Sequence, residues 1–279
     1  MNKLTLSLHQ ACLACALTFV LNAIALPLRA SFSMPSPVLN KFGKAIVSKK
    51  GQKVRFTRPS LPSRGAPTGR IWGGGNRSKD KCPPVAQPLT ALIPVYEMTS
   101  DGTRPSWALT VSDRPTFWFY VPYTLTQDLP VVFVLQDHQD NEIYSTSLTQ
   151  SGSSPGIVNV QLPATIPPLK SGEQYRWYFL IQCDSIGTHV EGVVERQPLT
   201  PEIQRQLQGK GLKEQAEIYA ANGIWYDALT ALAELRRNKS STPDALLDWQ
   251  GFLQSAGFET IIVDAPITNC CTPTKGSQK

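Results

Sequence analysis

The chain has 279 residues, of which 27 are Lys or Arg and 21 are Asp or Glu, giving a formal net charge of +6 at pH 7. The charge is unevenly distributed: residues 31–81 carry twelve basic side chains and one acidic side chain, whereas residues 82–279 carry thirteen basic and twenty acidic ones. A nucleic-acid-binding domain concentrates basic charge on its folded surface, so an acidic folded part excludes nucleic acid as the expected ligand.

The first thirty residues have the pattern of an export signal. Lys3 precedes a mostly apolar run at residues 11–28, and small residues near its end offer cleavage sites. An uncleaved membrane anchor is the alternative, but the run is marginal for the roughly 20 apolar residues of a span, and Asn22 and Pro27 interrupt it. We therefore expect residues 1–30 to be a signal peptide. The mature protein would then reach the periplasm, the cell envelope or the extracellular space without a transmembrane segment.

Residues 31–81 form a basic segment that is rich in Pro, Ser, Gly, Lys and Arg. Few of its residues could be buried, so its composition predicts a disordered arm. Such an arm acts either as a solvated spacer, which the composition favours, or as a tether to an anionic surface of the envelope.

Between residues 88 and 197 short apolar segments alternate with turn-rich pieces. Regular short strands separated by turns predict a β-sandwich, which we assign to residues 82–198. The expected strands are Leu89–Glu97, Ser106–Val111, Thr116–Val121, Pro130–Asp137, Glu142–Thr149, Gly156–Leu162, Gln174–Cys183 and Val190–Arg196.

The sequence RPTFWFYVPY at residues 114–123 is the strongest strand pattern of the chain. Side chains alternate across a strand, so Phe117 and Phe119 face one way while Trp118 and Tyr120 face the other. Because neither face can be left to water, the pattern predicts a central strand of a packed all-β layer, with the aromatic side chains in the interior.

A second signature lies at the start of the seventh expected strand. Leu169, Gly172 and Tyr175 have the spacing of a tyrosine corner, in which a Tyr hydrogen-bonds to the backbone just upstream. This spacing predicts a sandwich of the immunoglobulin-like or fibronectin-like kind.

Four of the six cysteines remain once the signal peptide is removed. In an oxidising compartment four cysteines allow three complete pairings. Cys82 precedes the first strand and Cys183 closes a late one, so we predict a Cys82–Cys183 disulfide. A bond between the adjacent Cys270 and Cys271 would be strained, which leaves this pair for intermolecular links in a disordered tail of residues 268–279.

Residues 199–267 have a helical pattern and predict a C-terminal extension. Thr200-Pro201 and Thr242-Pro243 each place a capping residue before a proline at the first helical position. The apolar spacing resembles a single tetratricopeptide repeat followed by a cap helix. One repeat builds no concave peptide groove, so we expect this hairpin to pack against the sandwich in a mixed α+β fold. The expected helices are residues 212–222, 226–237 and 243–256.

Candidate catalytic and metal sites have little support. Gly152–Gly156 fits the G-x-S-x-G pattern of serine hydrolases, but it lies between two strands instead of at a strand-to-helix turn. His138 and His189 have no nucleophile nearby in the sequence. The acidic loop at residues 137–142 lacks the glycine and the late glutamate of an EF-hand calcium loop. We predict no catalytic residue, no metal site and no cofactor.

Aromatic side chains raise the question of sugar binding, because exposed Trp and Tyr rings stack on sugar faces as in other amphipathic contacts. Most aromatic residues alternate within strands and are better explained as core. Trp72 and Trp225 are the two that we least expect to be buried.

A set of segments spread along the chain forms a recognisable pattern: Arg64–Pro67, Gly73–Gly75, Cys82, Arg114–Tyr123, Pro155–Val158, Tyr175–Phe179, Cys183–Asp184, Val190–Gly192 and Ile224–Leu229. Together they resemble a secreted cyanobacterial family, known as domain of unknown function 928. The resemblance covers residues 64–267. The family carries no established activity, so the resemblance implies export and the order of the domains but no site.

Taken together, the sequence predicts an exported, non-enzymatic binding or structural module of the cell envelope. Its expected partner is an envelope protein or glycan. The alternative is an envelope hydrolase whose site is assembled from distant strands, and a pocket that joins His138 or His189 to a buried carboxylate would favour it.

Overall fold

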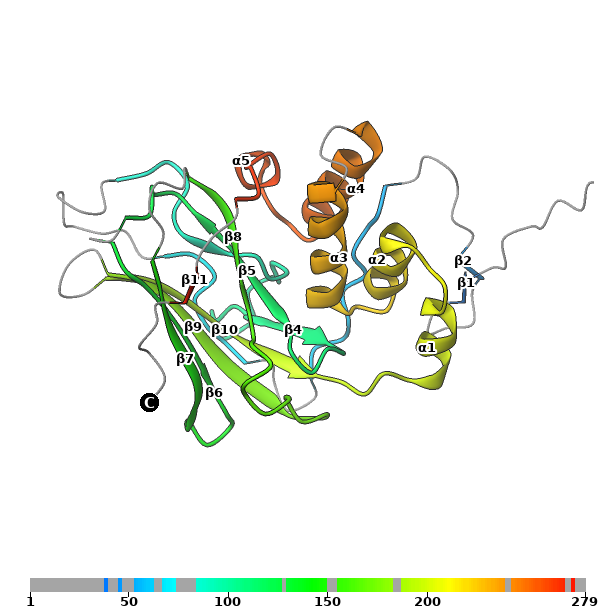
Figure 1. Ribbon diagram of the computed structural model, residues 1–279, viewed down its shortest axis with the longest axis horizontal. Helices are drawn as coiled ribbons and strands as arrows, with labels where there is room; N and C mark the ends of the chain where they lie inside the picture. The colour runs from blue at the N-terminus through cyan, green and yellow to red at the C-terminus, as the bar shows by residue number, and fades with distance from the viewer. Residues whose placement is uncertain are drawn as a thin grey trace, which may run out of the picture. The chain divides into compact units, whose positions relative to one another are not determined.

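The computed structural model describes ten segments of the chain (Figure 1), which are residues 38–39, 45–46, 53–62, 67–73, 84–126, 129–149, 155–182, 187–238, 242–268 and 272–273. The chain forms two units, residues 1–36 and 37–279, and all described residues belong to the second. The expected signal peptide and both cysteines of the predicted disulfide, Cys82 and Cys183, lie outside the described residues.

The larger sheet has six strands in the order β11-β7-β6-β9-β10-β4. Neighbouring strands are antiparallel except β10 and β4, which are parallel. The strands are β4 (Trp107–Thr110), β6 (Val131–Gln136), β7 (Glu142–Thr149), β9 (Gln174–Ile181), β10 (Thr188–Arg196) and β11 (Thr272–Pro273).

The smaller sheet is antiparallel and consists of β3 (Thr90–Ala91), β5 (Thr116–Val121) and β8 (Gly156–Gln161). The first expected strand, residues 89–97, is shorter than predicted, because only Thr90 and Ala91 pair as a strand. Pro94 has no N–H to donate to a ladder, which explains why pairing does not extend through this segment. A separate antiparallel pair is formed by β1 (Val38–Leu39) and β2 (Ala45–Ile46).

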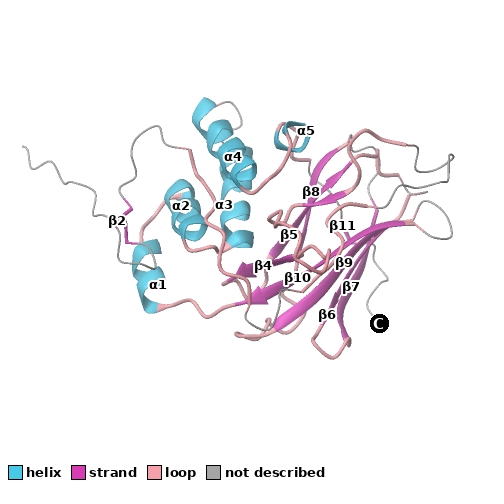
Figure 2. Ribbon diagram, turned by 180° about the vertical axis from the view of Figure 1, so that it is seen from behind, coloured by secondary structure: helices cyan, strands magenta, loops and turns pink. Residues whose placement is uncertain are grey.

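Five helices lie between β10 and β11 in the described part of the chain (Figure 2). The three helices that the sequence predicts are confirmed as α2, α3 and α4. Two further short helices, α1 and α5, were not predicted. The helices are α1 (Pro201–Leu207), α2 (Leu212–Ala221), α3 (Trp225–Asn238), α4 (Pro243–Ser255) and α5 (Thr260–Val263). Within the described residues, no helix has the length and apolar character needed to cross a membrane.

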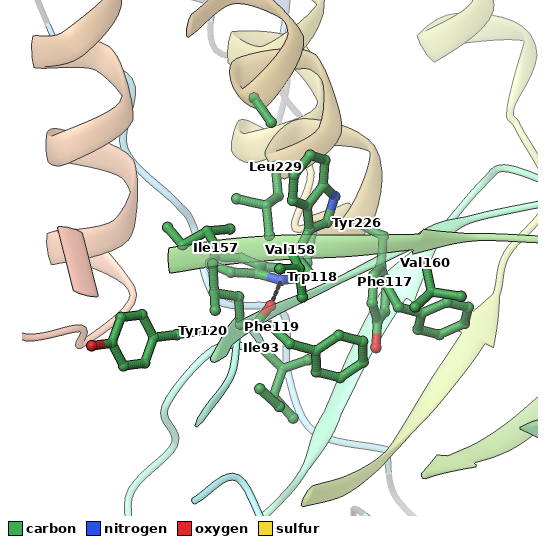
Figure 3. Close-up of a cluster of buried hydrophobic side chains, with 14 of the residues drawn as sticks. Ile93, Phe117, Trp118, Phe119, Tyr120, Ile157, Val158, Val160, Tyr226 and Leu229 are labelled. Atoms are coloured by element: carbon green, nitrogen blue, oxygen red, sulfur yellow. Dashed lines mark hydrogen bonds between the residues drawn. The ribbon is translucent and has the colours of Figure 1, made fainter. Parts of the chain in front are cut away.

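Strand β5 is buried on both faces, as its sequence predicts. On one face Phe119 stacks on Phe179 of the larger sheet, with ring centroids 4.0 Å apart. Trp118 lies on the other face (Figure 3). It donates a hydrogen bond to Thr230 Oγ1 of α3 at 3.1 Å, and the Arg237 guanidinium lies 5.2 Å from its ring. The expectation of an all-β layer is therefore corrected, because a helix and not a third sheet covers the second face.

Residues 53–62 lie in the arm that we expected to be disordered, but in the structure they pack on the helices (Figure 1). Val54 and Phe56 are buried, and the Phe56 ring contacts the edge of Trp225 at 4.9 Å. The Phe56 N–H donates to Ser255 Oγ and the Thr57 N–H to the Ala220 carbonyl. Val54 and Phe56 anchor this segment although the residues around them are mostly polar or basic. The average composition of residues 31–81 does not reveal a pattern of only two apolar residues.

Residues 67–73 also belong to the expected arm, and they connect the two sheets. The Arg70 carbonyl accepts from the Glu191 N–H of β10, whereas the Gly73 N–H donates to the Leu89 carbonyl beside β3. Ile71 is buried between these contacts. This stretch is part of the folded unit, so the disordered-arm expectation is wrong for it as well.

The hydrogen bond of the predicted tyrosine corner is present. Tyr175 is the second residue of β9 and is buried, and its hydroxyl accepts a hydrogen bond from the Lys170 N–H at 2.8 Å. Leu169, the apolar member of the signature, is buried beside it. The corner fixes the loop that leads into the central strands of the larger sheet.

Candidate functional site

A cavity of about 210 Å³ opens where helices α2 and α3 meet the ends of β4, β5 and β8. We call it the Asp227 cleft. Its polar lining comprises Thr110, Ser112, Arg114, Thr116, Gln161, Gln215, Tyr219, Asp227, Thr230 and Glu234. Hydroxyl, amide and carboxyl groups therefore converge from three strands and two helices that are spread along the sequence.

Asp227 is in the first turn of α3 and anchors that helix to the larger sheet. Its Oδ2 accepts hydrogen bonds from Thr110 Oγ1 at 2.7 Å and from the Val111 N–H at 3.1 Å. Burial raises the pKa of this carboxyl to about 6, although the two hydrogen bonds favour the charged form and oppose the shift. The cleft thus contains a carboxyl group that exchanges its proton close to neutral pH.

Tyr219 of α2 lines the same cleft. Burial, together with the negative charge of Asp227, raises the pKa of its phenol to about 12. The hydroxyl consequently stays protonated at neutral pH and is able to donate a hydrogen bond. The neighbouring Tyr226 is directed into the core, where its hydroxyl accepts from Trp177 Nε1 at 3.0 Å.

The only guanidinium among the lining residues has a structural role. Arg114 donates from Nε to the Pro163 carbonyl at 3.3 Å and from Nη2 to the Ile166 carbonyl at 3.0 Å. By contrast, the side chains of Gln161 and Glu234 are exposed and have no hydrogen-bond partner among the described residues. The groups left for a ligand are therefore neutral or acidic, which suits a hydroxylated or cationic molecule better than an anion.

The two histidines are not part of this cleft. His138 is at the tip of the β6–β7 hairpin, with Nδ1 3.6 Å from Glu173 Oε2, whereas His189 lies near the other end of the sheet, opposite Leu180 of β9. Neither His138 nor His189 lines the cleft, so neither is brought close to the Asp227 carboxyl group. The predicted alternative of a histidine-based hydrolase site therefore gains nothing from this arrangement.

The carboxylate of Asp137 stabilises the turn of the acidic loop at residues 137–142. Asp137 Oδ1 accepts from the Gln139 N–H at 2.8 Å and from the Asn141 N–H at 3.0 Å. The Asn141 side chain and these backbone bonds hold the pKa of Asp137 below its usual range. No group of three or more His, Cys, Asp or Glu side chains within the described ranges is arranged to hold a metal ion. Of the G-x-S-x-G segment, Gly152 to Ser154 lie outside those ranges.

The two tryptophans singled out for sugar binding behave differently. Trp225 is fully buried between Phe56 and Phe252, so the expectation of its exposure is wrong. Trp72 is 38% exposed, and the Arg104 guanidinium lies 5.4 Å from its ring centre. Neither ring lines the Asp227 cleft.

Sequence reasoning missed Asp227 and Tyr219 as members of a site. An acidic residue in the first helical turn is common because it complements the helix dipole, so Asp227 carried no special signal. Its one distinguishing feature was its place inside the segment Ile224–Leu229, which contributed to the family resemblance.

The family described as Domain of Unknown Function (DUF928) matches residues 72–267, and the chain belongs to that family. No curated protein matches the sequence. The matched region includes every residue that lines the Asp227 cleft, whereas residues 53–62 lie outside it.

Proposed function

We propose that this protein is an exported, non-enzymatic binding module of the cell envelope, and that its Asp227 cleft binds a sugar unit of an envelope glycan. The observation that carries the proposal is the lining of the cleft, in which hydroxyl, amide and carboxyl groups converge without an available cation. Sugars are recognised by such mixed donors and acceptors, and an acidic cleft disfavours anions.

The size of the cleft supports a small ligand unit. Sites for drug-sized molecules occupy roughly 300–1,000 Å³, and this cavity is about 210 Å³. A single ring with its hydroxyl groups is a reasonable occupant, and the rest of a glycan chain would extend past the exposed Gln161 and Glu234 into solvent.

The finer fold assignment belongs to the same proposal. We infer an immunoglobulin-like sandwich, because the orders β10-β9-β6-β7 and β3-β5-β8 correspond to the G-F-C-C′ and A-B-E orders of variable-type domains. The stacked pair Phe119–Phe179 links the strands that the B–F disulfide links in those domains. We further infer that α2 and α3 form a single tetratricopeptide-like hairpin, that residues 1–30 are a signal peptide, and that Cys82 pairs with Cys183.

The test is a titration of the exported protein with purified envelope polysaccharides and their oligosaccharide fragments. Glu234→Gln and Gln161→Ala alter groups that have no hydrogen-bond partner among the described residues, so these variants should fold normally. We expect each to weaken binding about tenfold, the effect of one lost hydrogen bond to a charged or polar partner. Glu214→Gln, on the exposed side of α2, is the matched control and should bind like the wild type. Absence of binding by every glycan, or equal binding by all variants, would overturn the proposal.

A hydrolase is the second candidate, and one observation favours it. Asp227 and Glu234 are seven residues apart on α3, about two helical turns, and both line the cleft. Two carboxyl groups, one of them with a raised pKa, are the pair of groups that glycoside hydrolysis uses. Release of reducing ends from the bound glycan, lost both in Asp227→Asn and in Glu234→Gln, would replace the binding proposal with this one.

A further inference from the structure

Hydrogen bonds inside the Asp227 cleft determine which of its polar groups can still bind a ligand, and in which sense. Thr110 has no donor left, because its hydroxyl already donates to Asp227 Oδ2. Gln215 of α2 donates from Nε2 to the Lys210 carbonyl at 2.7 Å, so the oxygen of its amide is the group left over. The internal bonds of the cleft therefore use donors and leave acceptors.

Two guanidinium groups near the cleft are both bound to other partners. Arg114 lines the cleft, and besides its two carbonyl partners its Nη1 lies 3.3 Å from Asp113 Oδ2. Arg237, one turn beyond Glu234 on α3, donates from Nη2 to Asn159 Oδ1 at 2.8 Å. Burial lowers the pKa of Arg237 and the charge of Glu234 opposes this shift, but the two side chains form no ion pair. Within the described part of the chain, the Glu234 carboxylate is therefore available to a cation.

The bond between Arg237 and Asn159 also brings Glu234 and Gln161 to the same side of the cleft. Gln161 follows Asn159 by two residues on β8, so the two side chains lie on one face of the strand. Glu234 precedes Arg237 by three residues, so these two lie on one face of α3. Glu234 and Gln161 both line the cavity and both are exposed, whereas Asp227 lies deeper, about 10 Å away along the helix axis. A carboxylate and an amide therefore form the solvent-exposed side of the cleft.

We infer that the sugar unit bound by the Asp227 cleft carries a protonated amino group, as an unacetylated hexosamine does, and that Glu234 and Gln161 accept its hydrogen bonds. An ammonium group has three donors and no acceptor, so it matches a place where acceptors are left over. A hydroxyl group offers the same oxygens one donor without a charge, and a hydrogen bond between two charged groups is the stronger one. This inference rests on the proposed function, because it specifies the kind of sugar that the proposed function leaves open.

Deeper in the cleft, the remaining ring hydroxyl groups meet both donors and acceptors. Thr230 accepts from Trp118 Nε1, so its own hydroxyl proton can be donated to a ligand. Tyr219 is a second donor, and Asp227 is an acceptor. These groups suit a sugar ring whatever its charge, and only the exposed side distinguishes an amino group from a hydroxyl group. The expected result is therefore a preference for the amino sugar, with weaker binding of a neutral one.

The probes are three trisaccharides with the same β-linked glucose skeleton, which differ in carrying a hydroxyl, an acetamide or an amino group beside the anomeric carbon of each ring. Their affinities for the purified full chain are measured by titration calorimetry at about pH 6.5, where the amino groups are largely protonated. We expect the amino sugar to bind about tenfold more tightly than the other two, because a hydrogen bond to a charged group is stronger than one between neutral groups.

In Glu234→Gln this preference should disappear, since glutamine keeps the size of the side chain and an acceptor oxygen but not the charge. Glu214→Gln, the matched control on the exposed side of α2, should keep the preference. Equal affinities of the amino and hydroxyl sugars, binding of none of the three, or a preference that persists in Glu234→Gln would each overturn the inference. A neutral sugar that binds without any preference for the amino one would overturn the inference alone and leave the proposed function in place.

Discussion

Replacing Phe56 with Ala removes the side chain that anchors residues 53–62 on the helices. Phe56 is 7% exposed, and its ring contacts Trp225 at 4.9 Å and Phe252 at 5.9 Å. Truncation of a buried Phe costs about 3–5 kcal/mol. Residues 53–62 can detach locally while the remainder stays folded. We therefore expect a loss at the lower end of this range, about 3 kcal/mol of the free energy of unfolding. If residues 53–62 were disordered, the substitution would leave the free energy of unfolding unchanged.

The assay is equilibrium urea unfolding of the purified protein, followed by tryptophan fluorescence. Arg55→Ala is the matched control, because Arg55 is exposed in the same segment. Hydrogen exchange adds a local readout, since the Phe56 and Thr57 amides donate to Ser255 Oγ and the Ala220 carbonyl and should exchange slowly. Stabilities of Phe56→Ala and Arg55→Ala within about 0.5 kcal/mol of each other, the range of ordinary surface changes, would refute the packing argument.

Two further predictions concern buried charges. Lys213→Met leaves the Asp248 carboxylate, whose side chain is 4% exposed, without its ion-pair partner, so we expect the free energy of unfolding in urea to fall by about 3 kcal/mol. Adding Asp248→Asn removes the unpaired charge and should recover part of this loss. Equal stability of the single and double variants would contradict the reasoning. Asp227 has a folded-state pKa of about 6, above its unfolded value, so its contribution to stability is fully present below about pH 4 and is lost as the pH rises through 6. We expect Asp227→Asn to gain stability relative to the wild type between pH 4 and pH 8, by at most about 3 kcal/mol, and a constant difference across this range would contradict the pKa assignment.

Local patterns predicted the central elements of the fold well. The alternation of Phe117 and Phe119 with Trp118 and Tyr120 required burial on both faces, and the spacing from Leu169 to Tyr175 required one particular hydrogen bond. Both depend on neighbouring residues and on side-chain size, which the sequence states directly. The identity of the layer over Trp118 was not accessible in this way, because an aromatic face packs equally well against a helix or a sheet.

The Asp227 cleft and the packing of residues 53–62 could not be predicted for a different reason. Thr110, Gln161 and Asp227 come from three separate elements, and no spacing in the sequence relates them. Phe56 docks on Trp225 and Phe252 in a basic segment whose average composition points to disorder. Features of this kind depend on tertiary contacts, and a sequence pattern read segment by segment does not contain them.

The packing of residues 53–62 on the helices also has a consequence for the order in which the chain folds. The Val54 N–H donates to Asp248 Oδ1 and the Phe56 N–H to Ser255 Oγ, partners that are 194 and 199 residues further along the chain. Contacts of such long range form late and slow folding, because a large loop must close first. During synthesis, Val54 and Phe56 would remain exposed to proteases and chaperones until α4 has emerged. A chain interrupted before α4 would therefore leave a site for quality control at its N-terminal side.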